Sequence, residues 1–326
     1  MGGPARPFHT HTGSRYRRGL GHICLFQGQL DLGPAMNFMN TTMTDAQLRK
    51  QERLIARKYA DRFPWEVPVW GLGNMLIWLS LWPLVLLDIL PLWIAFPIAC
   101  INVMACFLPA HEAVHGMIAR PGEKLRWLNE LVGHLSLLPM AMPYRLQKGT
   151  QMEHHKHVNH TENDPDITTQ SKGPWDASWQ SFVQRQRGKG GAMRGYGYIL
   201  EKVGRNDVLV DGALYQLCFF SILFALAWNG YAIEAALLWW APRHIGIAYI
   251  QFFFSWAPHH PAHEKGRYTN AKFWKSRVGN IASMGMQYHL IHHLHPFIPL
   301  RDTPRAFREL RPILEARGCT IEGDLK

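Results

Sequence analysis

The chain has 326 residues, of which 47% are hydrophobic and 18% charged, and this composition is too apolar for a disordered protein. The 35 Lys and Arg exceed the 24 Asp and Glu by 11. Such an excess of positive charge is typical of a protein that binds nucleic acid or lies at an anionic membrane surface. The five cysteines form neither a CxxC pair nor a framework spacing, which argues against a disulfide scaffold and a thiolate zinc site.

The first part of the chain predicts a tail. Residues 1–35 carry Gly, Arg and His without a continuous apolar stretch, so they do not resemble a cleaved secretory signal. We expect residues 1–45 to be disordered. Met36, Met39 and Met43 follow closely, so an over-long start is the alternative interpretation of this segment.

Two apolar regions predict membrane spans. Residues 67–110 contain no Lys or Arg and are interrupted only around 88–91, so at about 20 residues per crossing they make two spans joined by a tight turn. Residues 208–228 and 231–257 form a second hairpin, with Arg243 as its single basic residue. Buried helices of a large soluble protein are the less favoured alternative, because soluble helices rarely run this far without a charged face.

The placement of the basic residues predicts the orientation. There are 10 Lys and Arg in 1–66, none in 67–110, 13 in 111–207, one in 208–258 and 11 in 259–326. The positive-inside rule then places both termini and the central segment in the cytoplasm. We therefore expect an all-α integral membrane protein, of the bacterial inner membrane, with four transmembrane helices in two hairpins and a cytoplasmic helical cap.

The central segment contains two weaker features. Residues 131–143 are apolar but too short to cross a membrane, which favours an interfacial or re-entrant helix. Residues 160–206 are predicted to be a polar loop with short helical pieces.

Histidines form three groups. All but three of the 18 histidines lie between positions 111 and 295. The groups are His111 and His115; His154, His155, His157 and His160; and His289, His292, His293 and His295. Residues three and four apart share a helix face, so the first pair can hold one metal and His289, His292 and His293 can point at one position.

These groups predict a multinuclear metal site. A lone HxxxH pair is weak evidence for a metal site, but three groups of histidines without competing Cys ligands are strong evidence. A structural zinc ion needs only four ligands, so eight or more histidines indicate two metals. Imidazole suits zinc, copper, iron and nickel. The lack of bridging carboxylates in the groups, together with the membrane setting, favours redox iron over a dizinc hydrolase.

The sequence resembles the membrane fatty-acid-desaturase superfamily, which carries HxxxH, HxxHH and HxxHH boxes beneath a four-helix membrane bundle. Within it, the chain is most similar to the desaturase-like β-carotene hydroxylases, over about residues 65–310. That closer likeness is carried by HHKHVN at 154–159, ENDPD at 162–166, the Trp256–His259 segment, and QYHLIHHLHPFIPL at 287–300. The resemblance implies a desaturase-like membrane domain over 46–312 and a C-terminal tail at 313–326.

The resemblance also implies the ligands of an iron pair: His111, His115, His154, His155, His259, His289, His292 and His293. His260 and His263 are weaker candidates. The chain departs from the pattern at Gln151, where the family has the first histidine of its second box. Either His157 or His160 substitutes there, or one iron is held less tightly.

Other residues keep open roles. His134 and His157 are either ligands, hydrogen-bond partners of ligands, or interfacial polar residues, and His295 is expected to be a bystander. His244 is assigned a structural or substrate-tunnel role. Asp164 and Asp166 can orient ligand imidazoles or simply form a turn. Aromatic residues of the spans can line an apolar channel, or more often face lipid and core: Trp78, Trp82, Trp93, Phe252, Phe253 and Phe254.

The implied activity is that of a non-haem diiron oxidoreductase with two Fe per chain. It would use O2, a lipophilic substrate from the bilayer and electrons from a ferredoxin-type donor, since the chain has no flavin, haem or nucleotide motif of its own. Our first hypothesis is hydroxylation of the ionone ring of β-carotene, and the second is a fatty-acyl desaturase or hydroxylase. The third is a non-redox, zinc-binding membrane protein. No nucleic-acid partner is expected, because clustered basic-aromatic motifs are absent.

Overall fold

A computed structural model describes residues 43–322, with the exception of 61, 187–191 and 275–276. The predicted tail therefore lies almost wholly outside the described residues. Over the described part the fold is helical, apart from two strands of two residues each.

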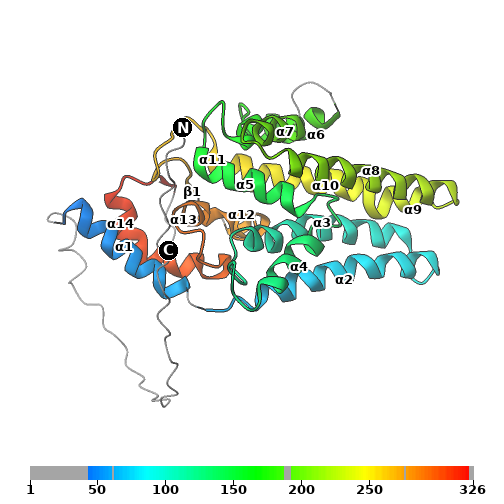
Figure 1. The fold of residues 1–326 in the computed structure, drawn as a ribbon, viewed down its shortest axis with the longest axis horizontal. Helices are drawn as coiled ribbons and strands as arrows, with labels where there is room; N and C mark the ends of the chain where they lie inside the picture. The colour runs from blue at the N-terminus through cyan, green and yellow to red at the C-terminus, as the bar shows by residue number, and fades with distance from the viewer. Residues whose placement is uncertain (1–42, 61, 187–191, 275–276, 323–326) are drawn as a thin grey trace, which may run out of the picture. The chain divides into compact units, whose positions relative to one another are not determined.

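Three described helices are long and apolar enough to cross a membrane: α2 (Glu66–Leu86), α3 (Leu92–Val114) and α8 (Asn206–Trp228). The first two form the predicted hairpin, with the turn at 87–91. Figure 1 shows α2, α3, α8 and α10 (Ala241–Ile250) running side by side. The protein is therefore an integral membrane protein.

The predicted fourth span has a more complex structure. Residues 232–259 are helical throughout, but two π-helical stretches divide them: α9 (Ala232–Ala235), η3 (Ala236–Trp240), α10, η4 (Gln251–Trp256) and α11 (Ala257–His259). Of the four predicted transmembrane helices, three are thus supported by length and composition. A π turn adds a residue and changes the direction of the side chains that follow it, and such turns are frequent at functional sites. The second stretch, η4, ends three residues before His259.

The packing of α10 against α3 depends on a glycine. A Cβ atom at Gly246 would lie 2.4 Å from Cγ1 of Val103, whereas one at Gly73 of α2 would meet nothing within 4 Å. We expect Gly246→Ala to lower the melting temperature of the detergent-solubilised protein, since overpacking costs about 1–3 kcal/mol. Gly73→Ala is the matched control, and equal melting temperatures of the two variants would contradict the expectation.

Two short helices follow α3 on the polar side of the bundle. Only residues 131–136 of the short helix predicted over 131–143 are helical, at the end of α4 (Arg126–Ser136). A turn at 137–143 leads to α5 (Tyr144–His157). Both are tied to the last turn of α3: the Asn129 amide and the Tyr144 hydroxyl each donate a 2.8 Å hydrogen bond to the carbonyl of Ala113. A carbonyl at a helix end lacks an intrahelical donor, so these bonds satisfy it.

The segment between α5 and α8 forms the predicted short helical pieces. They are η2 (Pro165–Thr169), α6 (Pro174–Gln186) and α7 (Ala192–Lys202). Figure 1 shows α6 and α7 on one side of α5 and α10, and α6 contacts α10.

The C-terminal part packs with the first helix. Its elements are β1 (Phe273–Trp274), α12 (Arg277–Ala282), η5 (Met286–Tyr288), α13 (His289–Leu294), η6 (Leu300–Asp302), α14 (Thr303–Ala316) and β2 (Ile321–Glu322). Helix α1 (Asp45–Ala60) lies on α14, where Ala56, Phe307 and Leu310 share a buried cluster. The predicted boundary at 312 falls inside α14, and β2 pairs in parallel with β1. The chain up to residue 322 is therefore part of this unit, because hydrophobic packing continues past 312.

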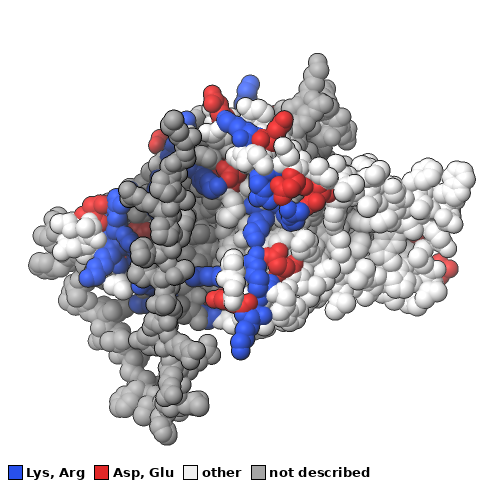
Figure 2. All heavy atoms as spheres, viewed as in Figure 1, with Lys and Arg blue, Asp and Glu red and all other residues white. Residues whose placement is uncertain are grey.

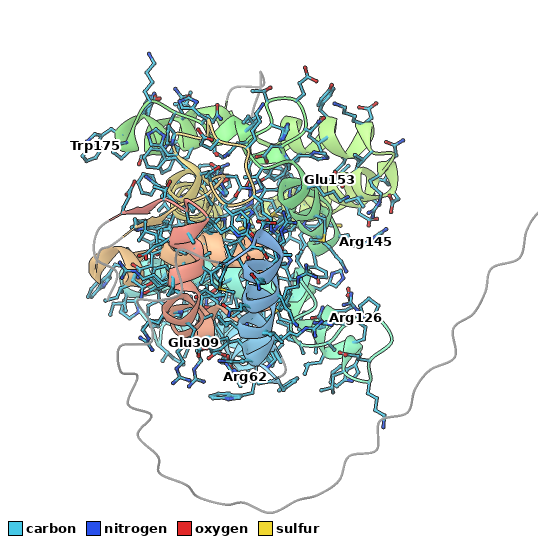
Figure 3. All side chains as sticks on the ribbon, turned by 90° about the vertical axis from the view of Figure 1, so that its left-hand side faces the viewer. Arg62, Arg126, Arg145, Glu153, Trp175 and Glu309 are labelled. Atoms are coloured by element: carbon cyan, nitrogen blue, oxygen red, sulfur yellow. The ribbon has the colours of Figure 1, made fainter. Side chains whose placement is uncertain are left out.

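The elements have a clear order along the bundle. Helices α1 and α14 lie at the end away from the α8–α9 turn, with α13 between them and the apolar helices (Figure 1). Figure 3 looks at that end and shows α1 and α14 in front. Figure 2 shows Lys and Arg gathered over α1 and in a row near the start of the apolar helices, which are themselves nearly free of charge on this face.

Candidate metal centre

The first histidine group is formed where α3, α5 and α13 meet. It consists of His111, His115, His155 and His292, whose nearest ring nitrogens all lie within 4.8 Å of one another. Nε2 of His155 and Nε2 of His292 are 3.0 Å apart. His111 lies in the last turn of α3 and His115 directly follows that helix, so their spacing places both rings on one side of it.

The second group is formed by α5, α11 and α13. It consists of His154, His259, His289 and His293, again with ligand atoms within 4.8 Å of one another. Nε2 of His289 lies 3.1 Å from Nε2 of His259 and 2.8 Å from Nε2 of His293. The rings of His155 and His293 stack with centroids 4.4 Å apart, so the two groups are immediate neighbours.

Helix geometry explains the division into two groups. His154 and His155 are successive residues of α5, so their side chains point about 100° apart and enter different groups. On α13, His289 and His293 are one turn apart and share the second group, while His292 points to the first. The expectation that all three histidines of α13 point at one position was therefore wrong.

Burial keeps most of these imidazoles neutral. Desolvation lowers the pKa of five of them well below the usual range: His115, His155, His289, His292 and His293. His154 differs: burial lowers its pKa, but the charge and hydrogen bond of Asp164 outweigh this and raise the pKa to about 9. Neutral imidazole is the form that binds a metal ion.

Hydrogen bonds hold two of the rings in the second group. Nδ1 of His154 lies 2.8 Å from Oδ1 of Asp164, and Nδ1 of His259 lies 2.9 Å from the carbonyl oxygen of Asn270. Each ring donates its Nδ1–H, which leaves Nε2 free to bind a metal. Asp166 has a different role: it accepts hydrogen bonds from Tyr196 and Ser255, and its nearest oxygen is 3.9 Å from Nδ1 of His154.

The donor set fits metal ions. Two nitrogens that bind one ion at about 2.1 Å lie about 3 Å apart or slightly more, close to the observed separations. Nε2 of His115 is buried without a hydrogen-bond partner among the described residues, as a vacant ligand atom would be. The structure thus brings all eight predicted residues into two groups that can each hold a metal ion, and their role as ligands remains a prediction.

The other described histidines lie outside both groups. The ring of His134 packs on Tyr144, that of His244 on Trp240 and that of His260 on Trp256. His157 is half-exposed on α5 beside Glu153, with His160 as its ring neighbour. His263 belongs to neither group. His295 contacts Glu52 of α1 rather than a ligand.

Gln151 lies at the edge of the first group. Its Nε2 is 3.1 Å from Nε2 of His111, and turning the amide about its last bond presents Oε1 instead. Neither His157 nor His160 takes the position that the family pattern assigns to this residue. We expect Gln151→His to preserve or raise the metal content of purified protein, since imidazole is a better ligand than an amide. Complete loss of metal would contradict this.

Aromatic side chains cover the membrane side of the first group. Phe107 stacks on His111 with ring centroids 5.7 Å apart and on Phe254 at 5.6 Å. Phe254 was among the aromatic residues expected either to line a channel or to pack in the core, and it lies in a buried cluster. Phe107 was missed, although it precedes His111 by one helical turn. Trp78 and Trp82 instead pack into a core with Trp239, and Trp93 is exposed. The carbonyl of Asn270 had no sequence signal, because any residue supplies a carbonyl.

The fold and the site define an integral membrane protein with a buried polyhistidine centre at one end of its apolar helices. The family model for fatty acid desaturases matches residues 87–322, and the chain belongs to this family of oxidoreductases. It is therefore an enzyme.

Curated relatives fall into two kinds. A β-carotene ketolase of Paracoccus sp. (strain PC1) is 28% identical over 210 residues, which are 61% of this chain and 72% of the relative. A chloroplastic sn-2 acyl-lipid omega-3 desaturase (ferredoxin) of Helianthus annuus is 22% identical over 256 residues, 68% of this chain and 57% of the relative. An sn-1 oleoyl-lipid 12-desaturase of Anabaena variabilis is 30% identical over 97 residues, 28% of this chain and 25% of the relative.

Proposed function

We propose that this protein is a membrane diiron oxygenase that hydroxylates a lipophilic substrate, with the ionone ring of β-carotene as the target. The observation that carries the proposal is the pair of adjacent groups of four imidazoles, without a thiolate or carboxylate among the clustered donors. His111, His115, His155 and His292 would hold one iron, and His154, His259, His289 and His293 the other. Two Fe per chain follow from this assignment.

An iron pair bound there would supply the activation of O2 needed to break an unactivated C–H bond. The residues of the chain have separate tasks. Asp164 and the Asn270 carbonyl orient His154 and His259. The Phe107–Phe254 pair keeps water from the membrane side of His111 and offers an apolar surface to the substrate.

The comparison with the ketolase supports a carotenoid substrate. That relative is named for β-carotene, and this chain matches 72% of its length against 57% of the Helianthus annuus desaturase. Carotenoids dissolve in the bilayer, which agrees with a centre at the end of three apolar helices. A fatty-acyl desaturase or hydroxylase is the second candidate, favoured by the desaturases that align with 68% of the chain. Membership of an oxidoreductase family argues against the zinc-binding alternative.

The proposal includes partners and location. O2 and a ferredoxin-type electron donor are the other reactants, and the desaturases named with ferredoxin support the donor. We place the protein in the bacterial inner membrane, with four spans, and with the termini and the helical cap that carries the histidines in the cytoplasm. The desaturase-like domain is assigned to 46–312, extended by the C-terminal residues that pack with it.

Expression in a host that accumulates β-carotene tests the substrate. We expect zeaxanthin or its singly hydroxylated precursor in the pigment extract, separated by chromatography from ring ketones. Unchanged pigments with newly unsaturated acyl chains would support the desaturase instead. About two irons per purified chain are expected, and stoichiometric zinc in protein purified without added metal would contradict the diiron assignment.

A further inference from the structure

A cavity of about 520 Å³ opens between α1, the loop before β1 and the end of α13 with the residues that follow it. On one side it is lined by Arg49, Glu52, Arg53 and Arg57 of α1. On the other side it is lined by Arg267, Tyr268, Leu294, His295 and Phe297. Four arginines and one carboxylate make this opening positive. None of these residues belongs to the two histidine groups.

The α1 arginines form a row. Arg49, Arg53 and Arg57 are four residues apart, so they occupy successive turns of one helix face and span about 12 Å. All three are exposed, and Arg49 pairs with Asp45 at 2.7 Å. Arg53 and Arg57 form no salt bridge with another described residue. Positive charge of this extent attracts an acidic surface more than it fits one small anion.

Residues that line the cavity contact the segment that carries the second histidine group. Arg267 donates a 3.0 Å hydrogen bond to the carbonyl of Leu294, which directly follows His293 of the second group. Nε2 of His295 lies 3.0 Å from Oε1 of Glu52, and the Tyr268 hydroxyl donates to Oε2 of Glu52 at 2.8 Å. Both carboxylate oxygens of Glu52 therefore have partners among the residues that line the cavity. A protein bound at the row of arginines would stand directly over the segment that carries three of the predicted ligands.

A lipid surface does not suit this position. Helices α1 and α14 lie beyond the end of the apolar helices that is away from the α8–α9 turn (Figures 1 and 3), so α1 does not lie along the apolar surface that lipid would cover. Figure 2 shows Lys and Arg side chains over α1 on that end.

We propose that the cavity and its arginines Arg49, Arg53, Arg57 and Arg267 are the docking surface for an acidic, one-electron iron–sulfur protein that reduces the metal centre. This inference rests on the proposed function. Hydroxylation balances as R–H + O2 + 2 electrons + 2 H⁺ giving R–OH + H2O, so each turnover oxidises two reduced donors by one electron each. Complementary charge raises the rate of encounter and makes it sensitive to salt.

The test compares two charge-reversal variants of the full chain in detergent. Arg53→Glu with Arg57→Glu changes the row by four charges, and Arg120→Glu with Lys124→Glu makes the same change on the exposed loop between α3 and α4. With a reduced [2Fe–2S] ferredoxin as donor, we expect the first variant to raise the KM for ferredoxin by about tenfold or more and to lose most of its salt dependence. Its iron content and kcat at saturating donor should stay near those of the control.

Turnover with a small uncharged reductant separates this inference from the proposed function. If the wild type turns over with both reductants and the two variants have the same KM for ferredoxin, the docking surface is overturned. If the first variant loses turnover with the small reductant as well, the arginines act on the centre itself and the docking surface is again overturned. If the wild type hydroxylates nothing with either reductant, the proposed function fails instead.

Discussion

His292→Ala is expected to deplete the centre of iron and abolish turnover while leaving membrane insertion intact. The ring of His292 is buried, with its Nε2 3.0 Å from that of His155 and its centroid 4.4 Å from that of His111 and 4.6 Å from that of His115. Removing it leaves three imidazoles around an enlarged space. The spans do not depend on it, because their apolar length is unchanged. Metal analysis of purified protein and the protein content of the membrane fraction check both parts.

His157→Ala is the matched control for that variant. His157 lies on α5 close to the predicted ligands His154 and His155 but belongs to neither group, so its removal should leave iron content near that of the wild type. His292→Gln keeps much of the volume of the side chain and separates loss of a nitrogen ligand from collapse of the site. Full activity and normal iron content in His292→Ala would show that His292 is not a ligand.

Asp164→Ala is expected to weaken metal binding without removing a ligand. Asp164 is buried and accepts hydrogen bonds from Nδ1 of His154 at 2.8 Å, from the backbone N–H of Asn159 at 2.7 Å and from that of Asp166 at 2.9 Å. Its loss frees the His154 ring to turn and leaves buried donors unpaired. Loss of a partner that orients a ligand lowers metal affinity by about 10–100-fold.

The measurement is the affinity of the apo protein for Fe²⁺ in an anaerobic titration. Asp164→Asn retains an oxygen acceptor without the charge and should fall between Asp164→Ala and the wild type. Glu162→Ala, an exposed change two residues away in the same loop, should bind as the wild type does. Equal affinities of Asp164→Ala and Glu162→Ala for Fe²⁺ would show that Asp164 does not orient a ligand.

Local patterns predicted the elements that need only local information. The run of 44 residues without Lys or Arg at 67–110 indicates a hairpin of spans, because length and apolarity decide whether a helix crosses a membrane. The spacing of His111 and His115 likewise indicates a shared helix face. Both features are found in the structure, because neither depends on a distant part of the chain.

The predicted fourth span shows where a local pattern is insufficient. Residues 231–257 have the composition of a membrane helix, yet η3 and η4 divide the helical run. A π turn needs support from neighbouring elements, since its backbone geometry is less favourable than that of the α-helix. Such support comes from the packing of this run against α3 and α6, which the apolar pattern does not encode.

The sequence by itself determined the class of this protein: apolar lengths predicted membrane helices, and three groups of histidines predicted a metal site. Only the tertiary structure decided how the histidines are divided between the two groups. His154 and His155 diverge on any helix, but which group each joins depends on where α3, α11 and α13 meet α5. Contacts between segments more than 100 residues apart, such as His155 with His292, arise from packing of the whole chain rather than from local spacing.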